Sequence, residues 1–261
     1  MSQVLLITGG ASGIGAAVAR LAAERGFSIA LNYRTKQAQA EALVAELRAR
    51  GTRAAAYQAD VAEPRQVESL YARVKDELGV PRAVLNSAGI ATGATRVAEA
   101  ETATLELLLR TNVLGVMVSC REAARVMSTK SGGSGGVIIN VSSMAATIGG
   151  RPGNAHYAAS KAAVDAFSVG FAKEVAAEGI RVVSVRPGFT ITDMTRHRLE
   201  DAAFRQVIAE TIPLGRPARV EEVAAPIAWL LSNEASFITG TCLDISGGGF
   251  AIADSPRQRA D

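Results

Sequence analysis

The chain has 261 residues, of which 48% are hydrophobic and 20% are charged, and its formal net charge is +3. This length and composition support one large domain or two small ones with a substantial core, and they argue against disorder. The small, dispersed charge and the absence of a Lys/Arg-rich run argue against a nucleic-acid partner.

Cys120 and Cys242 are the only cysteines, and both stand in apolar surroundings. Two thiols in a chain of this length indicate buried packing in a reducing compartment rather than a disulfide framework. No basic segment followed by an apolar run opens the chain, and no uninterrupted apolar stretch reaches membrane length. We therefore expect a cytoplasmic protein without a membrane partner.

Short aliphatic runs alternate with segments of helical periodicity along the chain. The runs predicted as strands are 3–7, 27–32, 53–58, 83–86, 137–141, 180–185 and 242–245. The segments predicted as helices are 16–25, 35–50, 64–78, 102–127, 154–177, 201–210 and 220–231. The strands show little polar alternation and are therefore expected to be buried on both faces. The pattern predicts an α/β fold in which helices cover both faces of a parallel sheet of about seven strands.

No linker, repeat or shift in composition divides the chain, so we expect a single domain over residues 1–249. Residues 250–261 form a polar tail that either frays or packs on a neighbouring subunit.

A glycine-rich turn joins the first predicted strand to the first predicted helix. It reads T-G-G-A-S-G-I-G over residues 8–15 and contains Gly9, Gly13 and Gly15. Glycine permits a tight turn and lets the backbone approach a pyrophosphate, while the helix that follows offers free N–H groups and a positive dipole end. At the start of an alternating α/β chain, this turn predicts dinucleotide binding rather than a plain tight turn.

The spacing T-G-x-x-x-G-x-G resembles the short-chain dehydrogenase/reductase family, and the resemblance covers nearly the whole chain. It implies a Rossmann-type, doubly wound sheet with a nicotinamide cofactor on the glycine turn, where Ser12 and Ile14 stand beside the glycines. It also implies a substrate lid at residues 190–213, and a homotetramer or homodimer. The closest subgroups look like 3-oxoacyl-carrier-protein reductases and glucose-dehydrogenase-like members. The implied substrate is a small carbonyl or alcohol compound, with an acyl thioester included.

The second predicted strand ends in Asn32-Tyr33-Arg34, with Lys36 just beyond. An Asp or Glu there would hydrogen-bond a ribose 2′-hydroxyl group and repel a 2′-phosphate. Arg34 can instead bind a phosphate through two parallel hydrogen bonds, and Ser12 could donate another. We therefore expect NADP(H) to be preferred, with NAD(H) as the alternative. The other interpretation of Arg34 is a solvated loop arginine.

Three further segments resemble the family's cofactor contacts. Asp60-Val61 follows the third strand, where the family's Asp contacts the adenine amino group, although Asp60 could instead cap the next helix. Residues 86–89 resemble N-N-A-G with Ser in place of the second Asn, and residues 187–192 resemble the P-G-x-x-x-T segment that holds the nicotinamide carboxamide. The contacts implied by these segments are Asp60, Val61, Asn86, Ala88, Gly89, Pro187, Gly188, Thr190 and Thr192.

Tyr157 and Lys161 stand four residues apart in N-A-H-Y-A-A-S-K, a spacing that places both side chains on one face of a helix. A phenol holds its proton to a pKa of about 10, and a nearby ammonium group lowers that value. The pair could therefore exchange a proton near neutral pH. The spacing alone also suits a solvated helix face.

The family resemblance gives this pair a role. It implies that Tyr157 exchanges the proton of the carbonyl group, and that Lys161 binds the nicotinamide ribose and lowers the pKa of the tyrosine. Ser143 of N-V-S-S would orient the carbonyl, and Asn112 of T-N-V would hold a water of a proton relay. Structural roles at the strand end for Ser143 and within the helix for Asn112 are the alternatives.

Two expectations complete the interpretation. No cluster of His, Cys or carboxylate residues has metal-ligand spacing, so we expect no metal. The alternative to an enzyme is a sensor or scaffold that binds the cofactor without turnover.

Overall fold

Within residues 3–249, which the computed structural model describes, seven parallel strands form one sheet. They are β1 (Val4–Thr8), β2 (Ser28–Tyr33), β3 (Ala54–Gln58), β4 (Pro81–Asn86), β5 (Gly136–Val141), β6 (Ile180–Pro187) and β7 (Thr241–Ile245). Their order in the sheet is β3-β2-β1-β4-β5-β6-β7. The predicted parallel sheet is therefore confirmed, and β1 and β4 mark the place where the chain reverses its direction of winding.

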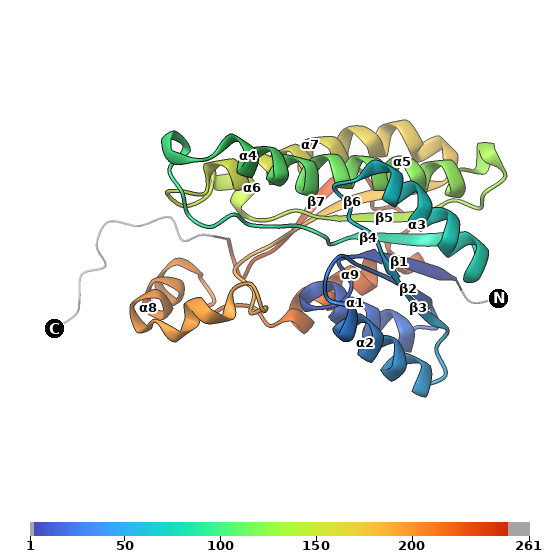
Figure 1. Cartoon of the computed structure of the whole chain (residues 1–261), viewed down its shortest axis with the longest axis horizontal. Helices are drawn as coiled ribbons and strands as arrows, with labels where there is room; N and C mark the ends of the chain where they lie inside the picture. Colours follow the sequence, from blue (N-terminus) through green and yellow to red (C-terminus); the bar gives the residue numbers. More distant parts are fainter. Residues whose placement is uncertain (1–2, 250–261) are drawn as a thin grey trace.

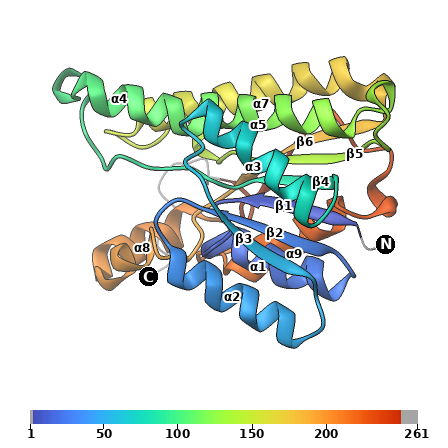
Figure 2. The same ribbon diagram turned by 45° about the vertical axis from the view of Figure 1, so that its right-hand side comes forward.

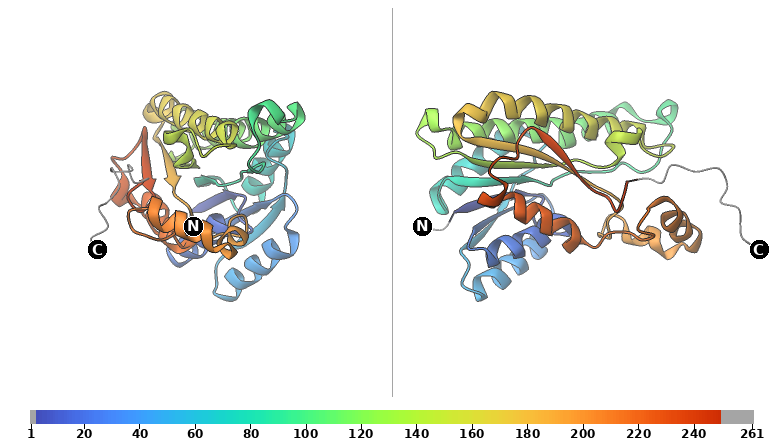
Figure 3. Two further views of the ribbon diagram at one scale, coloured as in Figure 1. Left: turned by 90° about the vertical axis from the view of Figure 1, so that its left-hand side faces the viewer. Right: turned by 180° about the vertical axis from the view of Figure 1, so that it is seen from behind.

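Helices cover both faces of this sheet, and they form a layer above and a layer below it (Figure 1, Figure 2). One layer contains α1 (Gly13–Glu24), α2 (Gln37–Ala49) and α9 (Val220–Leu230). The other contains α3 (Pro64–Glu77), α4 (Thr102–Leu109), α5 (Gly115–Met127), α6 (Ala145–Ile148) and α7 (Ala155–Val175). The end-on view of Figure 3 separates the two layers, and α8 (Ala202–Thr211) stands beyond the end of the sheet.

Each buried strand contributes to a hydrophobic core on both faces. In β1, Leu5 and Ile7 belong to the core under α1, α2 and α9, while Val4 and Leu6 belong to the core under α3, α5 and α7. Successive side chains of a strand point to opposite faces. A strand covered on both sides must therefore be apolar throughout, and this requirement explains the continuous aliphatic runs in the sequence.

The helix predicted at residues 102–127 is divided into three parts. A π-helical segment over Arg110–Leu114 separates α4 from α5. A β-carbon at Gly115 would lie 2.8 Å from the carbonyl oxygen of Val61, so glycine lets this helix approach the loop after β3. The widened turn is a recurrent feature of functional sites. The predicted helix is therefore continuous over Thr102–Met127, with its irregular turn directly before Gly115.

Two other helix boundaries differ from the prediction. α1 begins at Gly13 rather than at residue 16, because Ser12 is its extended N-cap, so the last two glycines of the turn lie in the first helical turn. The short helix α6, between β5 and α7, was not predicted. The domain limit at residue 249 stays a prediction, and the tail at residues 250–261 lies outside the described residues.

By length and composition, the continuous helical stretch Thr102–Met127 could cross a membrane, and 44% of its most apolar window is buried. Its buried residues, among them Val116, Val118 and Met127, belong to the core shared with α3 and α7. It is therefore a core helix of this fold. Cys120 and Cys242 are both free thiols, as the sequence indicated.

Candidate active site

The loops that follow β1 and β4 meet where the winding of the sheet reverses. Gly9 has a φ of +66°, and a β-carbon there would lie 2.8 Å from the backbone nitrogen and Cα of Ala88. The Ala88 N–H group donates to the Thr8 hydroxyl at 3.3 Å. Only glycine fits this contact, because it tolerates positive φ and has no β-carbon. In open α/β sheets, such a crevice outside the carboxyl ends of the strands is where ligands bind.

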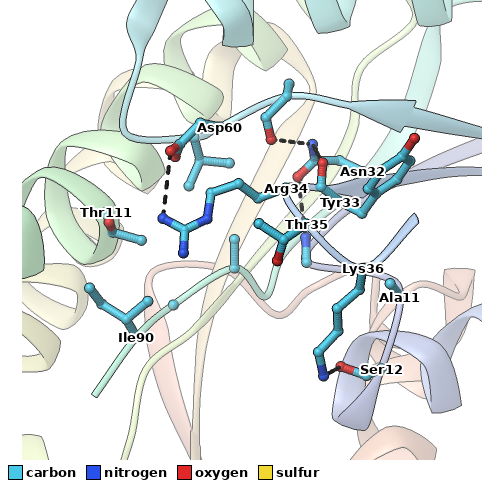
Figure 4. Close-up of a pocket in the computed structure, with 15 residues that line it drawn as sticks. Ala11, Ser12, Asn32, Tyr33, Arg34, Thr35, Lys36, Asp60, Ile90 and Thr111 are labelled. Carbon is cyan, nitrogen blue, oxygen red and sulfur yellow. Dashed lines mark hydrogen bonds and ion pairs between the residues drawn. The ribbon is translucent and has the colours of Figure 1, made fainter. Parts of the chain in front are cut away.

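A pocket opens at this crevice, and Figure 4 shows its lining. The expected residues that line it are Gly9, Ser12, Asn32, Tyr33, Arg34, Asp60, Val61, Ala88 and Gly89. The sequence analysis did not assign six others, which are Ala11, Thr35, Lys36, Ala59, Ile90 and Thr111. Most of the six adjoin residues that the motifs did identify, so their positions beside those motifs are the signal that could have found them.

Three polar groups stand at the end of β2 around the pocket. The Lys36 ammonium group donates to the Ser12 hydroxyl at 2.9 Å. The Arg34 guanidinium lies 3.6 Å from a carboxylate oxygen of Asp60 and extends across the pocket toward Thr111 (Figure 4). The Arg34 side chain is half exposed, so this ion pair is weak. Two cations and a hydroxyl group therefore border the place where some proteins have an acidic residue that repels a 2′-phosphate.

The side chain of Asn32 lines the pocket, but both of its polar atoms form hydrogen bonds with backbone groups. It is 1% exposed. Its amide nitrogen donates to the carbonyl oxygen of Ala59 at 2.9 Å, and its oxygen accepts from the N–H group of Gly9 at 3.3 Å. Asn32 therefore joins β2 and β3 to the glycine turn.

Asn86 lies beneath the pocket rather than on its surface. It is 2% exposed, and its amide nitrogen donates to Asn140 at 2.8 Å. Asn140 in turn donates to the Ser168 hydroxyl at 2.9 Å, which links β4 and β5 to α7. Asn86 is therefore not among the residues that line the pocket, and its contact with a cofactor stays a prediction. Its neighbours Ala88 and Gly89 do line the pocket.

Gly13, Ile14 and Gly15 lie in the first turn of α1, beside the pocket. A β-carbon at Gly13 would lie 3.5 Å from the side chain of Thr192, so the chain after β6 reaches the glycine turn. The ammonium group of Lys36 also pairs with Asp193 at 2.9 Å, and this pairing lowers the pKa of the carboxyl group. Two contacts therefore join the segment 190–213 to the pocket.

Hydrogen bonds hold the end of β6 and the segment after it to β7, to the chain after β5 and within the segment itself. Gly188 donates its N–H group to Ile245 at 2.9 Å, and the Thr190 hydroxyl donates to the carbonyl oxygen of Gly188 at 3.1 Å. The carbonyl oxygen of Pro187 accepts from the N–H group of Met144 at 3.0 Å. Because Met144 directly follows Ser143, this bond brings the two predicted segments side by side.

Lys161 lies in α7 with its ammonium group enclosed by protein. Its side chain reaches the end of β5, where Nζ donates to the carbonyl oxygen of Val141 at 2.9 Å. Burial lowers the pKa of Lys161 to about 8, although the carboxylate of Asp165 acts in the opposite direction. The nitrogen lies 5.9 Å from the ring centroid of Tyr157. The two residues therefore share one helix face, as the spacing predicted.

The pKa of Tyr157 is raised rather than lowered. Burial is the largest cause, and a hydrogen bond with the Ser143 hydroxyl acts against it. Lys161, whose ammonium group donates to the carbonyl oxygen of Val141, does not lower the pKa of Tyr157 as expected. The prediction of a depressed pKa is therefore wrong for this structure. A phenol with a raised pKa keeps its proton at neutral pH and can donate it.

Ser143 and Asn112 complete the predicted group of four. The Ser143 hydroxyl accepts from the N–H group of Ala145 at 3.1 Å. Asn112 is fully buried in the π-helical segment and holds the backbone of Ile90 at both of its polar atoms, at 2.9 and 3.0 Å. Its amide nitrogen also donates to the Ser160 hydroxyl at 3.1 Å. The oxygen of Asn112 keeps one lone pair free.

Among residues 3–249, no three or more His, Cys, Asp and Glu side chains are grouped so that they could hold a metal ion. His156 instead shares a hydrogen bond of 2.9 Å between its Nε2 atom and the hydroxyl group of Thr92.

A glycine turn against the crevice of a doubly wound parallel sheet, with a half-buried Tyr and a buried Lys nearby, defines a Rossmann-type α/β protein. The sequence matches the enoyl-(acyl carrier protein) reductase family over residues 9–249. It is 39% identical to the uncharacterized oxidoreductase YgfF of Escherichia coli, over 94% of this chain and 99% of that protein. It is 35% identical to the 3-oxoacyl-[acyl-carrier-protein] reductase FabG of Staphylococcus aureus, over 95% of this chain and 98% of that protein.

Solved structures agree with these matches. A short-chain dehydrogenase from Burkholderia cenocepacia, in complex with NADP, superposes with a TM-score of 0.86 at 34% identity, over 95% of this chain and 97% of that one. The chain belongs to the short-chain dehydrogenase/reductase family and is an oxidoreductase.

Proposed function

We propose that this protein is an NADP(H)-dependent oxidoreductase that interconverts a carbonyl compound and its alcohol. The observation that carries the proposal is the convergence of Ser143, Tyr157 and Lys161 next to a pocket bordered by Arg34 and Lys36. A β-carbon at Gly89, which lines this pocket, would lie 3.3 Å from Nζ of Lys161. The first three residues can place and protonate a carbonyl oxygen. The two cations suit a phosphorylated ribose.

The described residues fit such a cofactor. Gly9 and Ser12 of the glycine turn line the pocket, and the helix α1 directs its N-terminus at the same place. Ser12, Arg34 and Lys36 would bind the 2′-phosphate. Asp60 would contact the adenine, although its Oδ1 also accepts from the N–H group of Ala62 at 2.9 Å. The NADP complex of the Burkholderia relative supports the same assignment.

When bound, the cofactor supplies the hydride of the reaction. We propose that the Ser143 hydroxyl donates a hydrogen bond to the carbonyl oxygen and that Tyr157 gives that oxygen its proton. The raised pKa of Tyr157 keeps it protonated for this step. Lys161 would bind the nicotinamide ribose, and the free lone pair of Asn112 would hold a relay water. Pro187, Gly188, Thr190 and Thr192 would border the nicotinamide, under a lid formed by residues 190–213.

The cofactor assignment is tested by comparing kcat/KM for NADPH and NADH in the wild type, in Arg34→Ala and in Lys36→Ala. Each variant should lose about 10- to 100-fold with NADPH, because a charge-assisted contact is removed, and change little with NADH. A wild type that prefers NADH would establish the alternative, an NAD(H) enzyme.

The catalytic assignment is tested with Tyr157→Phe, which should abolish turnover while the Kd for NADPH stays unchanged. A Phe variant that retains activity would remove Tyr157 from the mechanism. A wild type that binds NADPH but turns over nothing in a broad panel of ketones, acyl thioesters, quinones and sugars would favour a sensor or scaffold.

We also propose a cytoplasmic homotetramer or homodimer. Leu107, Leu109 and Met117 on α4 and α5 are 36–49% exposed, and Phe237 is entirely exposed, which leaves apolar surface for a second copy. Light scattering coupled to gel filtration measures the mass, and a monomer at working concentration would contradict this proposal.

A further inference from the structure

Two arginines lie against one aromatic ring at the lid. The guanidinium carbon of Arg198 is 4.2 Å from the ring centroid of Phe204, and that of Arg151 is 5.6 Å from the same centroid. Phe204 also packs edge-on against Phe189 at 5.3 Å. Contact with an aromatic face holds a guanidinium group in place without using its hydrogen-bond donors. Both arginines therefore keep donors available.

No carboxylate within residues 3–249 pairs with either arginine. Arg151 makes one side-chain hydrogen bond, at 3.3 Å to the Thr211 hydroxyl. Burial and the charge of Arg198 both lower the pKa of Arg151, so the two cations repel each other in a partly desolvated place. An anion bound between them would relieve that repulsion.

Two other arginines of this region, Arg205 in the lid and Arg216 just beyond it, are engaged differently. Arg216 pairs with Glu222 through two hydrogen bonds of 2.7 and 2.8 Å, and Arg205 donates to backbone carbonyl oxygens of its own segment. Arg205 and Arg216 are therefore engaged by groups of the protein, unlike Arg151 and Arg198. Arg151 and Arg198 are two cations close to one ring without a paired carboxylate in the described residues 3–249, which suits a small anionic group.

The pair borders the proposed catalytic residues. Arg151 lies in the loop that leads into α7, and a β-carbon at the neighbouring Gly150 would lie 3.3 Å from Ala158, which follows Tyr157. Phe189 directly follows Gly188 in the segment after β6. Figure 1 shows α6 and α8 at the same end of the sheet, on either side of this region. A substrate at Tyr157 could thus extend to the arginine pair.

We propose that Arg151 and Arg198 bind an anionic group of the substrate, a carboxylate or a phosphate ester, so that the enzyme selects anionic carbonyl compounds. This inference rests on the proposed carbonyl reduction. A guanidinium group binds either anion through two parallel hydrogen bonds, and its planar geometry favours an oxyanion over a neutral ester or hydroxyl group.

The test compares matched substrates with NADPH. One pair is 4-oxopentanoate and its methyl ester, and the other is dihydroxyacetone phosphate and dihydroxyacetone. The wild type should favour the anion of at least one pair by about 10- to 100-fold in kcat/KM. The preferred pair identifies the anion as carboxylate or phosphate. Arg151→Gln and Arg198→Gln should each remove most of that preference and leave the neutral partner's kcat/KM unchanged.

Arg205→Gln is the matched control, because it alters an arginine of the same lid whose guanidinium group donates to the carbonyl oxygens of Leu199 and Glu200. Its preference for the anion should equal that of the wild type. Raising the salt concentration should weaken the preference in the wild type more than in Arg151→Gln. A preference that Arg205→Gln removes equally would point to general lid disturbance and overturn the assignment.

A binding measurement separates this inference from the proposed function. Calorimetry with the NADPH-loaded protein should detect glutarate or inorganic phosphate, but not glutaramide, and Arg151→Gln should lose the signal. Equal turnover of the anionic and neutral partners in both pairs would refute the anion site while leaving carbonyl reduction intact. Failure to reduce any carbonyl compound would refute the proposed function, and with it this substrate class.

Discussion

Replacing Lys161 with methionine should stabilise the fold, because an ammonium group is held in a buried position. Lys161 is 5% exposed, and its pKa falls from the usual 10.5 to about 8. At about 1.4 kcal/mol for each pH unit, that fall corresponds to about 3 kcal/mol against the folded state at neutral pH. Loss of the hydrogen bond to Val141 destabilises the variant by about 1 kcal/mol, so the expected net stabilisation is about 2 kcal/mol.

The pH dependence of this gain has a definite sign. Between pH 8 and pH 10.5 the folded wild type binds fewer protons at Lys161 than the unfolded chain, so raising the pH stabilises it. The advantage of Lys161→Met should therefore be constant below about pH 8 and shrink across this interval. Above pH 10.5, only the part of the stability difference that does not depend on the protonation of Lys161 remains.

Urea unfolding measures the effect through the fluorescence of Trp229, the single tryptophan. Lys173→Met is the control, since Lys173 is exposed on the same helix, and it should leave both the stability and its pH dependence unchanged. A Lys161→Met variant that is less stable at neutral pH, or whose advantage does not change between pH 8 and pH 10.5, would refute the reasoning.

Two further predictions concern packing and a buried ion pair. Gly115→Ala should destabilise the protein by about 1–3 kcal/mol, because the new methyl group would press on a backbone carbonyl group. Gly170→Ala has open space around it and should stabilise the protein by about 0.5–1 kcal/mol. Urea midpoints that shift in the same direction in both variants would contradict this prediction. Arg186→Met should cost about 3–5 kcal/mol in urea unfolding. It leaves the buried carboxylate of Asp165, now 2.7 Å from Arg186, with the Ser184 hydroxyl but without its charged partner. Adding Asp165→Leu should recover much of the loss, and a single variant as stable as the wild type would show that the pair contributes nothing.

The sheet and most helices could be predicted from local patterns. Strands buried on both faces need continuous apolar residues, and α2, α3 and α9 start or stop within two residues of the predicted limits. The seven-strand sheet and the pocket at the glycine turn followed from the same patterns. These features depend on neighbouring residues in the sequence, which is why the sequence carries them.

Features that depend on distant contacts were harder to predict. The π-helical segment at Arg110–Leu114 adjoins the approach of Gly115 to Val61, which no local pattern reveals. The amide group of Asn32 forms its hydrogen bond with Ala59, which follows β3. The pKa of Tyr157 is raised by burial, which depends on how α7 packs in the folded chain. Burial in the folded chain therefore raises the pKa of Tyr157, although the sequence spacing predicted that the charge of Lys161 would lower it.

The pairing of β1 with β4 also bears on folding. Leu5 pairs with Ala83, so the two walls of the pocket are joined only after the intervening chain has closed. Closing such a long segment costs entropy before its contacts form, and parallel pairing of this kind slows folding. A dinucleotide bound across that junction would recognise only the completed fold. It would therefore add to the free energy of unfolding in proportion to the logarithm of its concentration once the site is saturated.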